Sequence, residues 1–306
     1  MKINLLAFLV LISLLSSPSF VIAEVKPTLT PLQKILNGKH RSTENKNRDQ
    51  YRHPEQTLAF FNVEDDMTVV EISPGKGWYT EILAPYLRDK GKLYAAHFSP
   101  NNPETYFKDS LKAYLDKLHK RPGLYDKVEV TVLQPPKEVQ IAPDGSADRV
   151  LTFRNVHNWM KNDQAPTVFS AMFKALKPGG ILGIVEHRGS AIKPQDPKAV
   201  SGYVTEDYVI ALARKAGFEY LAKSEINANP KDTKNHPEGV WTLPPTLKLK
   251  DKDKEKYLAI GESDRMTIKF MKPQPKSLAS FLPKTFFVSS DRASFTEIPA
   301  VIHNSK

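Results

Sequence analysis

The stretch 67–87, MTVVEISPGKGWYTEILAPYL, constrains the fold of this chain more than any other part of its sequence. Its apolar start, residues 67–72, is typical of a buried strand, and the following run 73–77 has the glycines and proline of a tight turn. The amphipathic run 78–87 favours a helix. Because glycine has no Cβ, backbone N–H groups at the start of such a helix can approach a ligand closely. The stretch therefore predicts a strand–turn–helix unit, which either binds a ligand or serves as an ordinary connection.

Residues 1–23 have the composition of a secretory signal peptide. Lys2 supplies a positive charge, residues 5–15 are almost entirely apolar, and residues 21–23 (VIA) have a pattern compatible with cleavage. The apolar run is shorter than the roughly 20 residues that a membrane-spanning helix needs. We therefore predict a signal peptide and a periplasmic or secreted protein. The alternative is an uncleaved signal that anchors the protein in the membrane, which would be its only membrane contact.

The composition narrows the classes of protein to which the chain can belong. It has 306 residues and no cysteine, which excludes disulfides, thiolate metal sites and cysteine nucleophiles. Hydrophobic residues make up 40% of the chain, enough for a packed core. The formal net charge is +10, but basic residues are spread among acidic ones, so we expect no nucleic-acid partner. Residues 24–53 are polar, and we interpret them as a solvated arm, extended or partly helical.

Strand and helix patterns alternate after the opening unit. The strand patterns occur at 92–98, 128–133, 148–153 and 181–186. The helical patterns occur at 102–119, 165–176 and 205–216. Such alternation predicts a parallel sheet covered by helices on both faces, and sheets of this kind bind ligands beyond the carboxyl ends of their strands. The segments at those ends are 73–79, 97–99, 133–134, 154–159 and 186–188.

The sequence VVEISPGKGWYTEILAPYL resembles motif I of the class I S-adenosylmethionine-dependent methyltransferases, in which an acid precedes glycines at alternate positions. Glu71 occupies the place of the acid, and Gly75 and Gly77 match the second and third glycines. Ser73 stands where the first glycine usually is. Two further segments, APDGSADRVLTFRNVHNW and FKALKPGGILGIVEH, resemble the regions of the fourth and fifth strands of that fold. The closest resemblance is to a subgroup of predicted bacterial methyltransferases that carry signal peptides.

This resemblance implies a Rossmann-like α/β fold for residues 54–272. Its sheet would have seven strands, mostly parallel with an antiparallel last strand, and helices on both faces. Residues 218–226 and 263–271 suit the last two strands. Between them, residues 227–262 form a Pro- and Lys-rich excursion, which is either a partial lid over the site or a solvated loop. Residues 273–306 would form a tail outside the fold.

The resemblance also implies S-adenosylmethionine as the cofactor. Gly75 and Gly77 would contact its methionine end through their backbone, and Glu71 would hold the loop or interact with the donor's ammonium group. The chain departs from the family at the ribose, where an acid usually ends the second strand. His97 stands there instead, and a neutral histidine offers one donor and one acceptor. Gln134 would flank the adenine.

Other side chains are expected where the methyl group is transferred. Asn155 follows the fourth strand and would lie beside the donor, as would Ser73. Tyr79 and Trp159 could form an aromatic wall against the cationic sulfonium. For each aromatic residue the alternative is a place at the rim of the site.

A base is required only if the acceptor loses a proton, because methyl transfer is an in-line displacement that depends largely on positioning. His157 is the first candidate, followed by Glu186 and His187 at the end of the fifth strand. The alternative for the histidines is a structural hydrogen bond. The three residues resemble a two-histidine, one-carboxylate metal set, but neighbours on a strand point to opposite faces, so we predict no metal site.

The sequence therefore predicts a methyltransferase that acts on an unidentified small molecule or envelope component. The alternative is an exported ligand-binding protein with the same fold and no catalytic activity. No G-x-S-x-G, P-loop or H-E-x-x-H pattern occurs in the sequence, so hydrolase, nucleoside-triphosphatase and zincin functions have no support.

Overall fold

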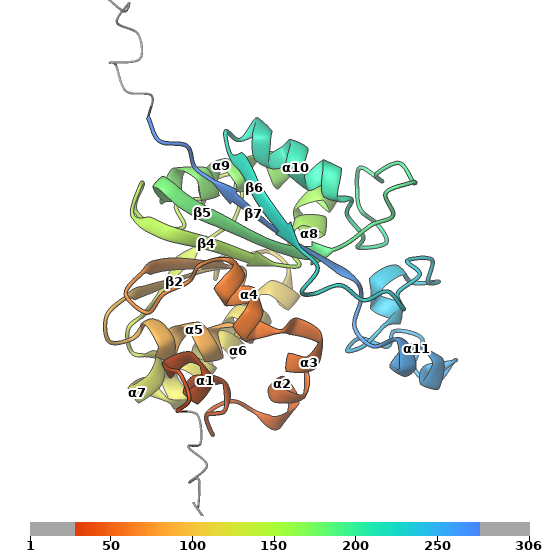
Figure 1. Ribbon diagram of the computed structural model, residues 1–306, viewed down its shortest axis with the longest axis horizontal. Coiled ribbons are helices and arrows are strands. Elements are labelled where there is room, and N and C mark those ends of the chain that lie inside the picture. Colours follow the sequence, from red (N-terminus) through yellow and green to blue (C-terminus); the bar gives the residue numbers. More distant parts are fainter. Residues whose placement is uncertain (1–27, 276–306) are drawn as a thin grey trace, which may run out of the picture.

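The strand segments pair into one seven-stranded sheet in the computed structural model, which describes residues 28–275 (Figure 1). In chain order the strands are β1 (Thr68–Ile72), β2 (Lys92–His97), β3 (Val128–Val132), β4 (Ala147–Phe153), β5 (Leu176–His187), β6 (Glu219–Ser224) and β7 (Arg265–Met271). Their spatial order is β3-β2-β1-β4-β5-β7-β6. Strand β7 is antiparallel to both of its neighbours, and the other pairs are parallel. The predicted fold class is confirmed.

Helices cover both faces of the sheet, as the alternating pattern predicted (Figure 1). Helices α8, α9 and α10 pack on one face, and α4, α5 and α6 pack on the other. The helices are α1 (Pro31–Leu36), α2 (Thr43–Asn47), α3 (Asp49–Arg52), α4 (Pro54–Phe60), α5 (Thr80–Leu87), α6 (Thr105–Lys120), α7 (Pro122–Tyr125), α8 (Val156–Lys161), α9 (Ala165–Ala175), α10 (Glu206–Lys215) and α11 (Lys254–Ile260), with a 3-10 turn at Gly239–Thr242.

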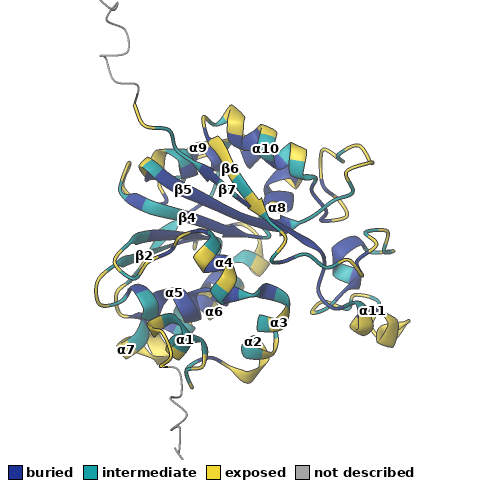
Figure 2. Ribbon diagram, in the orientation of Figure 1, coloured by how far each residue is buried: buried dark blue, intermediate teal, exposed yellow. Residues whose placement is uncertain are grey.

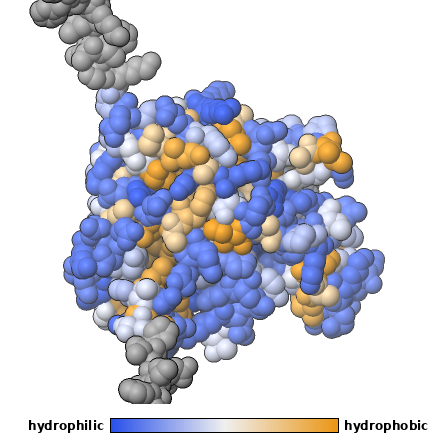
Figure 3. Space-filling view, in the orientation of Figure 1, coloured by the Kyte–Doolittle hydropathy of each residue, from blue (hydrophilic) through white to orange (hydrophobic). Residues whose placement is uncertain are grey.

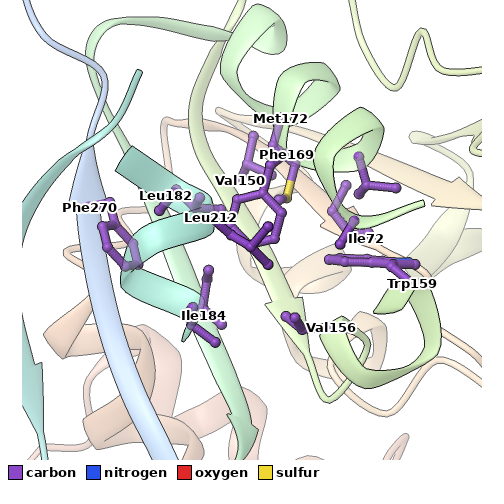
Figure 4. Close-up of a cluster of buried hydrophobic side chains, with 14 of the residues drawn as sticks. Ile72, Val150, Val156, Trp159, Phe169, Met172, Leu182, Ile184, Leu212 and Phe270 are labelled. Atoms are coloured by element: carbon purple, nitrogen blue, oxygen red, sulfur yellow. The ribbon is translucent and has the colours of Figure 1, made fainter. Parts of the chain in front are cut away.

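Two hydrophobic cores hold the sheet, one on each face. Neighbouring residues of β1 point to opposite sides. Val69 packs in the cluster that contains residues of α5, whereas Val70 and Ile72 pack in the cluster that contains residues of α8 and α9. Figure 4 shows part of the second cluster, where Phe169 is fully buried. Because both faces are covered, the central strands are buried along most of their length (Figure 2).

The order of the strands reverses at β1, which pairs with β2 on one side and with β4 on the other. At the carboxyl end of β1, Ile72 lies opposite Ala96 of β2 and Thr152 of β4. The loops that follow these three strands therefore leave the sheet at the same edge. This is the place at which open α/β sheets bind ligands.

Residues 31–52 do not form the solvated arm that their polarity suggested. They form α1, α2 and α3, which lie beside the opening unit (Figure 1). His40 Nε2 lies 2.8 Å from the carbonyl oxygen of Glu81, and the indole N–H of Trp78 donates to the carbonyl of Asn45 at 3.2 Å. Arg41 is only 3% exposed. Some polar side chains of this segment thus anchor it to the domain, and others remain exposed.

The excursion between β6 and β7 is partly packed and partly exposed. Asn227 Nδ2 donates to the hydroxyls of Thr57 and Thr267 at 3.0 and 2.9 Å, which ties the start of the excursion to the domain. Helix α11, near its end, is largely exposed (Figure 2). The ring of Trp241 lies 6.1 Å from that of His157. The excursion therefore borders the predicted catalytic region at one point, and most of it lies elsewhere.

The predicted signal peptide at 1–23 lies outside the described residues, as does nearly all of the predicted tail. Within residues 28–275, no helix combines the length and apolar character needed to cross a membrane. Figure 3 shows one face of the protein, where hydrophilic side chains surround smaller apolar areas.

Candidate functional site

A cavity of about 1380 Å³ lies at the carboxyl ends of β1, β2, β3 and β4. The loops after these strands line it, and residues of α2, α3 and α6 complete its walls. Sites for a single small ligand have volumes of roughly 300–1,000 Å³. The cavity is larger than that range, so it has room for a cofactor and a second molecule together.

The two glycines of the loop after β1 have different roles. Gly75 has a φ of 59° and lines the cavity, and a Cβ added to it would meet no atom within 4 Å. Gly77 has a φ of 76°, but a Cβ there would lie 3.0 Å from the ring of Tyr114 and 3.3 Å from Thr80. Gly75 thus leaves its backbone open to a ligand, whereas Gly77 is needed for the packing of the loop against α6. The prediction that Gly77 contacts the cofactor is not supported by its buried position.

His97 does not face the cavity, against the prediction that it takes the place of the ribose-binding acid. Its side chain is fully buried, and the N–H of Phe98 donates to its Nδ1 at 2.8 Å. Because Nδ1 is an acceptor, Nε2 carries the proton and donates to the carbonyl of Gly75 at 3.0 Å. Burial lowers the pKa of His97, so the ring stays neutral. His97 therefore fixes the loop that carries Gly75.

Glu71 is buried at the end of β1 and reaches the wall of the cavity. The hydroxyl of Thr80 donates to its Oε2 at 2.6 Å. Burial raises the pKa of Glu71 from 4.5 to about 7, although the Thr80 hydrogen bond and the charge of Lys117 act in the opposite direction. A cationic ligand group nearby would favour the ionised form. Both alternatives of the sequence prediction remain open: the Thr80 hydrogen bond lets Glu71 hold the loop, and its place at the cavity wall lets it bind an ammonium.

Four more of the predicted cofactor-site residues line the cavity: Ser73, Tyr79, Gln134 and Asn155. Tyr79 stacks on Phe153 with ring centroids 3.6 Å apart, and burial raises its pKa to about 12. Asn155 Nδ2 donates to the carbonyl of Ile72 at 3.0 Å, and its Oδ1 accepts no hydrogen bond from residues 28–275. Asn155 therefore presents an acceptor to the cavity. Trp159, the second member of the predicted aromatic wall, also lines it.

The predicted catalytic residues His157, Glu186 and His187 come together at the ends of β4 and β5. Nδ1 of His157 lies 3.0 Å from Oε1 of Glu186, and the rings of the two histidines are 5.3 Å apart. Glu186 is fully buried and also accepts the backbone N–H groups of Val156 and His187, at 2.6 and 2.8 Å. A carboxylate that accepts from Nδ1 leaves Nε2 of His157 without a proton. In its neutral form, His157 can then act as a base through that atom. None of the three residues lines the cavity, but Asn155 and Asn158, on either side of His157 in sequence, do, so an acceptor has to reach Nε2 past this part of the wall.

The three side chains come together although Glu186 and His187 are neighbours on β5. One ligand-capable atom from each of His157, Glu186 and His187 lies within 4.8 Å of the others. The argument from opposite faces is therefore wrong for this site. Burial lowers the pKa of His187 well below its usual range, and His157 and three nearby arginines lower it further. These positive charges oppose a divalent cation, so we assign no metal to the cluster.

Arg52 and Arg154 also line the cavity, and sequence reasoning did not select either of them. Arg52 belongs to the segment interpreted as a solvated arm. Its place at the cavity becomes visible only when that segment is seen packed against the domain. Arg154 directly follows β4, at a strand end that the sequence analysis had marked for ligands. Its position was therefore a usable signal.

No protein-family model matches the chain, and no curated protein matches it. Solved structures share its fold at low sequence identity. The [4+2]-cyclase SpnF is 15% identical with a TM-score of 0.51, and the match covers 78% of this chain and 86% of that one. A protein from Galdieria sulphuraria, provisionally named a sarcosine dimethylglycine methyltransferase, is 16% identical with a TM-score of 0.50, covering 76% and 87%.

A third match is an S-adenosylmethionine-dependent methyltransferase from Aquifex aeolicus, which is 19% identical with a TM-score of 0.49, covering 74% of this chain and 93% of that one. At these identities the likeness shows the fold and no more. The proteins that share the fold have names for different reactions, a cyclisation among them, so the reaction has to be argued from the site.

The raised pKa of Glu71 predicts a pH-dependent stability. Because folding raises this pKa, the protonated carboxyl stabilises the folded state fully below pH 4.5, and this contribution is lost as the pH rises through about 7. Glu71→Gln removes the titration. We expect the variant to gain on the order of 3 kcal/mol over the wild type between pH 4.5 and pH 8.

Urea-induced unfolding at pH 5 and pH 8 measures this difference. Glu129→Gln, which changes an exposed acid in β3, is the control and should show no such gain. An equal stability difference between Glu71→Gln and the wild type at both pH values would contradict the assignment.

Proposed function

We propose that this protein is an S-adenosylmethionine-dependent methyltransferase that acts on an unidentified small molecule or envelope component. The observation that carries the proposal is the cavity at the carboxyl ends of β1 and β4, with the Cβ-free backbone of Gly75 open to it. The structure from Galdieria sulphuraria, which shares the fold and is named a methyltransferase, supports it.

The residues around Gly75 fit the methyl donor. The donor's methionine end carries an ammonium group, and Glu71 offers a buried carboxyl at the wall of the cavity. Oδ1 of Asn155 offers a hydrogen-bond acceptor at the same wall. The ring of Tyr79 is stacked on Phe153 and only 3% exposed, so it supports this wall and presents no free face to a sulfonium. When bound, S-adenosylmethionine supplies a methyl group on a positively charged sulfur, which is reactive towards nucleophiles.

The protein's part in the reaction is to position the acceptor and to remove its proton where it carries one. Nε2 of His157 takes that proton, because the Nδ1 proton is held by Glu186 at 3.0 Å. Glu186 is a positioning residue: its carboxylate accepts the backbone N–H groups of Val156 and His187 and holds the ring of His157. Burial keeps His187 neutral beside His157.

One observation favours the alternative, a ligand-binding protein without catalytic activity. His97 stands where the family that the chain resembles has a ribose-binding acid, and it uses both of its ring nitrogens within the protein, so it offers no group to a ribose. A methyltransferase and a non-catalytic binding protein would both bind the cofactor, but only the first would transfer its methyl group. The labelling experiment on His157 below therefore separates them.

Cofactor binding is tested by Gly75→Val. The branched side chain would enter the cavity, so we expect calorimetric titration to show no binding of S-adenosylmethionine or S-adenosylhomocysteine. Gly145→Val is the matched control, because Gly145 has a φ of 65°, has no atom within 4 Å of an added Cβ and lies outside the cavity. Both variants carry a similar backbone strain of about 1–2 kcal/mol. An unchanged affinity of Gly75→Val for these ligands would show that the loop after β1 does not bind the cofactor.

Catalysis is tested by His157→Asn, with methyl-labelled S-adenosylmethionine and an envelope extract as the source of acceptor. We expect the variant to bind S-adenosylhomocysteine as the wild type does and to lose methyl incorporation by about 10²–10⁴-fold. His119→Asn, at an exposed position of α6, should keep full activity. Full activity in His157→Asn would reject His157 as the base. No incorporation by the wild type would favour the ligand-binding alternative.

We also propose that residues 1–23 direct export to the periplasm or outside the cell. An alkaline phosphatase fusion after residue 40 should be active, and the same fusion with Leu9→Arg in the apolar run should be inactive. An inactive wild-type fusion would reject export. The mass of the purified protein distinguishes cleavage before Glu24 from an uncleaved anchor.

A further inference from the structure

Four arginines surround one carboxylate beside the cavity; we call them the arginine cluster. They are Arg48, Arg52, Arg154 and Arg265, and the carboxylate belongs to Glu262. Arg48 Nε donates to Glu262 Oε1 at 2.5 Å, Arg265 pairs with Oε2, and Arg52 Nε lies 3.5 Å from Oε2. Burial alone would raise the pKa of Glu262, but the arginines hold it well below its usual range. The cluster therefore keeps an excess of positive charge.

That excess is located on Arg52 and Arg154. The guanidinium of Arg52 makes no hydrogen bond to residues 28–275, although its side chain is only 4% exposed and lies 4.5 Å over the ring of Trp78. The half-buried guanidinium of Arg154 makes no hydrogen bond and no ion pair within the same residues. Both side chains line the cavity. Arg52 thus keeps one long ion pair, to Glu262 at 3.5 Å, and Arg154 has no partner among residues 28–275. Both guanidinium groups reach the wall of the cavity with donors available.

Burying such charges without partners is unfavourable. Burial lowers the pKa of Arg52 well below its usual range, with the charge of Arg154 as the next cause, and burial lowers that of Arg154 to about 10. The backbone of Arg154 is held in a left-handed conformation with a φ of 64°, while its N–H donates to the carbonyl of Val185 at 2.7 Å. An oxyanion would stabilise these two positive charges, because guanidinium groups bind carboxylates and phosphates through paired hydrogen bonds.

We propose that Arg52 and Arg154 bind an oxyanion, a carboxylate or a phosphate, carried by the methyl acceptor. The proposal rests on the proposed methyltransferase function and names its substrate class. Neutral analogues of the acceptor would leave the excess positive charge of the two guanidinium groups without a counter-ion, so the site would select against them.

The position of the pair favours the acceptor over the carboxylate of the methyl donor. Arg154 lies in the short connection between β4 and α8, three residues before the candidate base His157 in the first turn of α8. An anion held by the pair would therefore place the rest of its molecule beside that base. The donor's amino-acid end brings an ammonium group as well, for which Glu71 is the matching partner.

The first arm of the test measures anion binding by thermal unfolding of the purified protein, with and without S-adenosylhomocysteine. Inorganic phosphate and acetate are the probes, and sodium chloride at equal ionic strength is the reference. We expect both anions to raise the melting temperature of the wild type, since ligands that bind the folded state stabilise it. Arg52→Gln and Arg154→Gln should lose this rise. Lys120→Gln, which removes a positive charge from another wall of the cavity, should keep it.

Stability without ligand separates a binding role from a structural one. Arg154→Gln removes an unpaired charge, so we expect it to be at least as stable as the wild type. A lower melting temperature together with an unchanged response to phosphate would overturn the proposal. If the Gln variants do not fold, Arg52→Lys and Arg154→Lys keep the charge but lose the paired donors, and they should bind phosphate at least about tenfold more weakly.

The second arm distinguishes the acceptor from the donor as the source of the oxyanion. 5′-Methylthioadenosine lacks the amino-acid end of S-adenosylhomocysteine. If the pair binds the acceptor, both Gln variants should bind the two nucleosides as the wild type does. A loss of affinity for S-adenosylhomocysteine alone would assign the pair to the donor and overturn the proposal. If phosphate raises the melting temperature of the wild type but neither nucleoside binds, the methyltransferase function is rejected and the anion site remains supported.

Discussion

The carboxylate of Glu186 holds together the part of the structure on which the proposed chemistry depends. It accepts the N–H of Val156 at the start of α8 and the N–H of His187 at the end of β5, and it orients the ring of His157. Two strands that are neighbours in the sheet are thereby fixed to each other beyond their last paired residues. The same carboxylate sets the tautomer of His157, so the fold and the reactivity of the site have one cause.

The fold was predictable because its main signals are local. Apolar strands alternating with amphipathic helices predicted the sheet, and the glycines after β1 marked its ligand-binding edge. The predictions that were wrong concern residues whose roles depend on contacts with distant parts of the chain. Arg48 and Arg52 read as surface charges, yet they meet Glu262 of the β6–β7 excursion. His97 and Gly77 were assigned to the cofactor because their positions match a motif. Only three-dimensional packing shows that one holds the loop and the other makes room for Tyr114.

Charge is distributed unevenly around the cavity, and this restricts what can react there. Glu71 offers a carboxyl that a cation would ionise, while Arg52 and Arg154 offer positive charge that an anion would neutralise. A sheet of this architecture is compatible with several reactions, as the shared fold of a [4+2]-cyclase illustrates. The assignment of a methyl donor and an anionic acceptor therefore depends on these side chains more than on the strand order.

The ion pairs of Glu262 span almost the whole described chain, since Arg48 and Glu262 are 214 residues apart in sequence. Arg265, which shares this carboxylate, belongs to β7, inserted between β5 and β6. During synthesis the first helices leave the ribosome long before their partners exist. Contacts with α5 can form early, but Arg48 and Arg52 lack their counter-ion until Glu262 has been made. The wall of the cavity is thus completed last, and a chain truncated before residue 262 would lack a finished site.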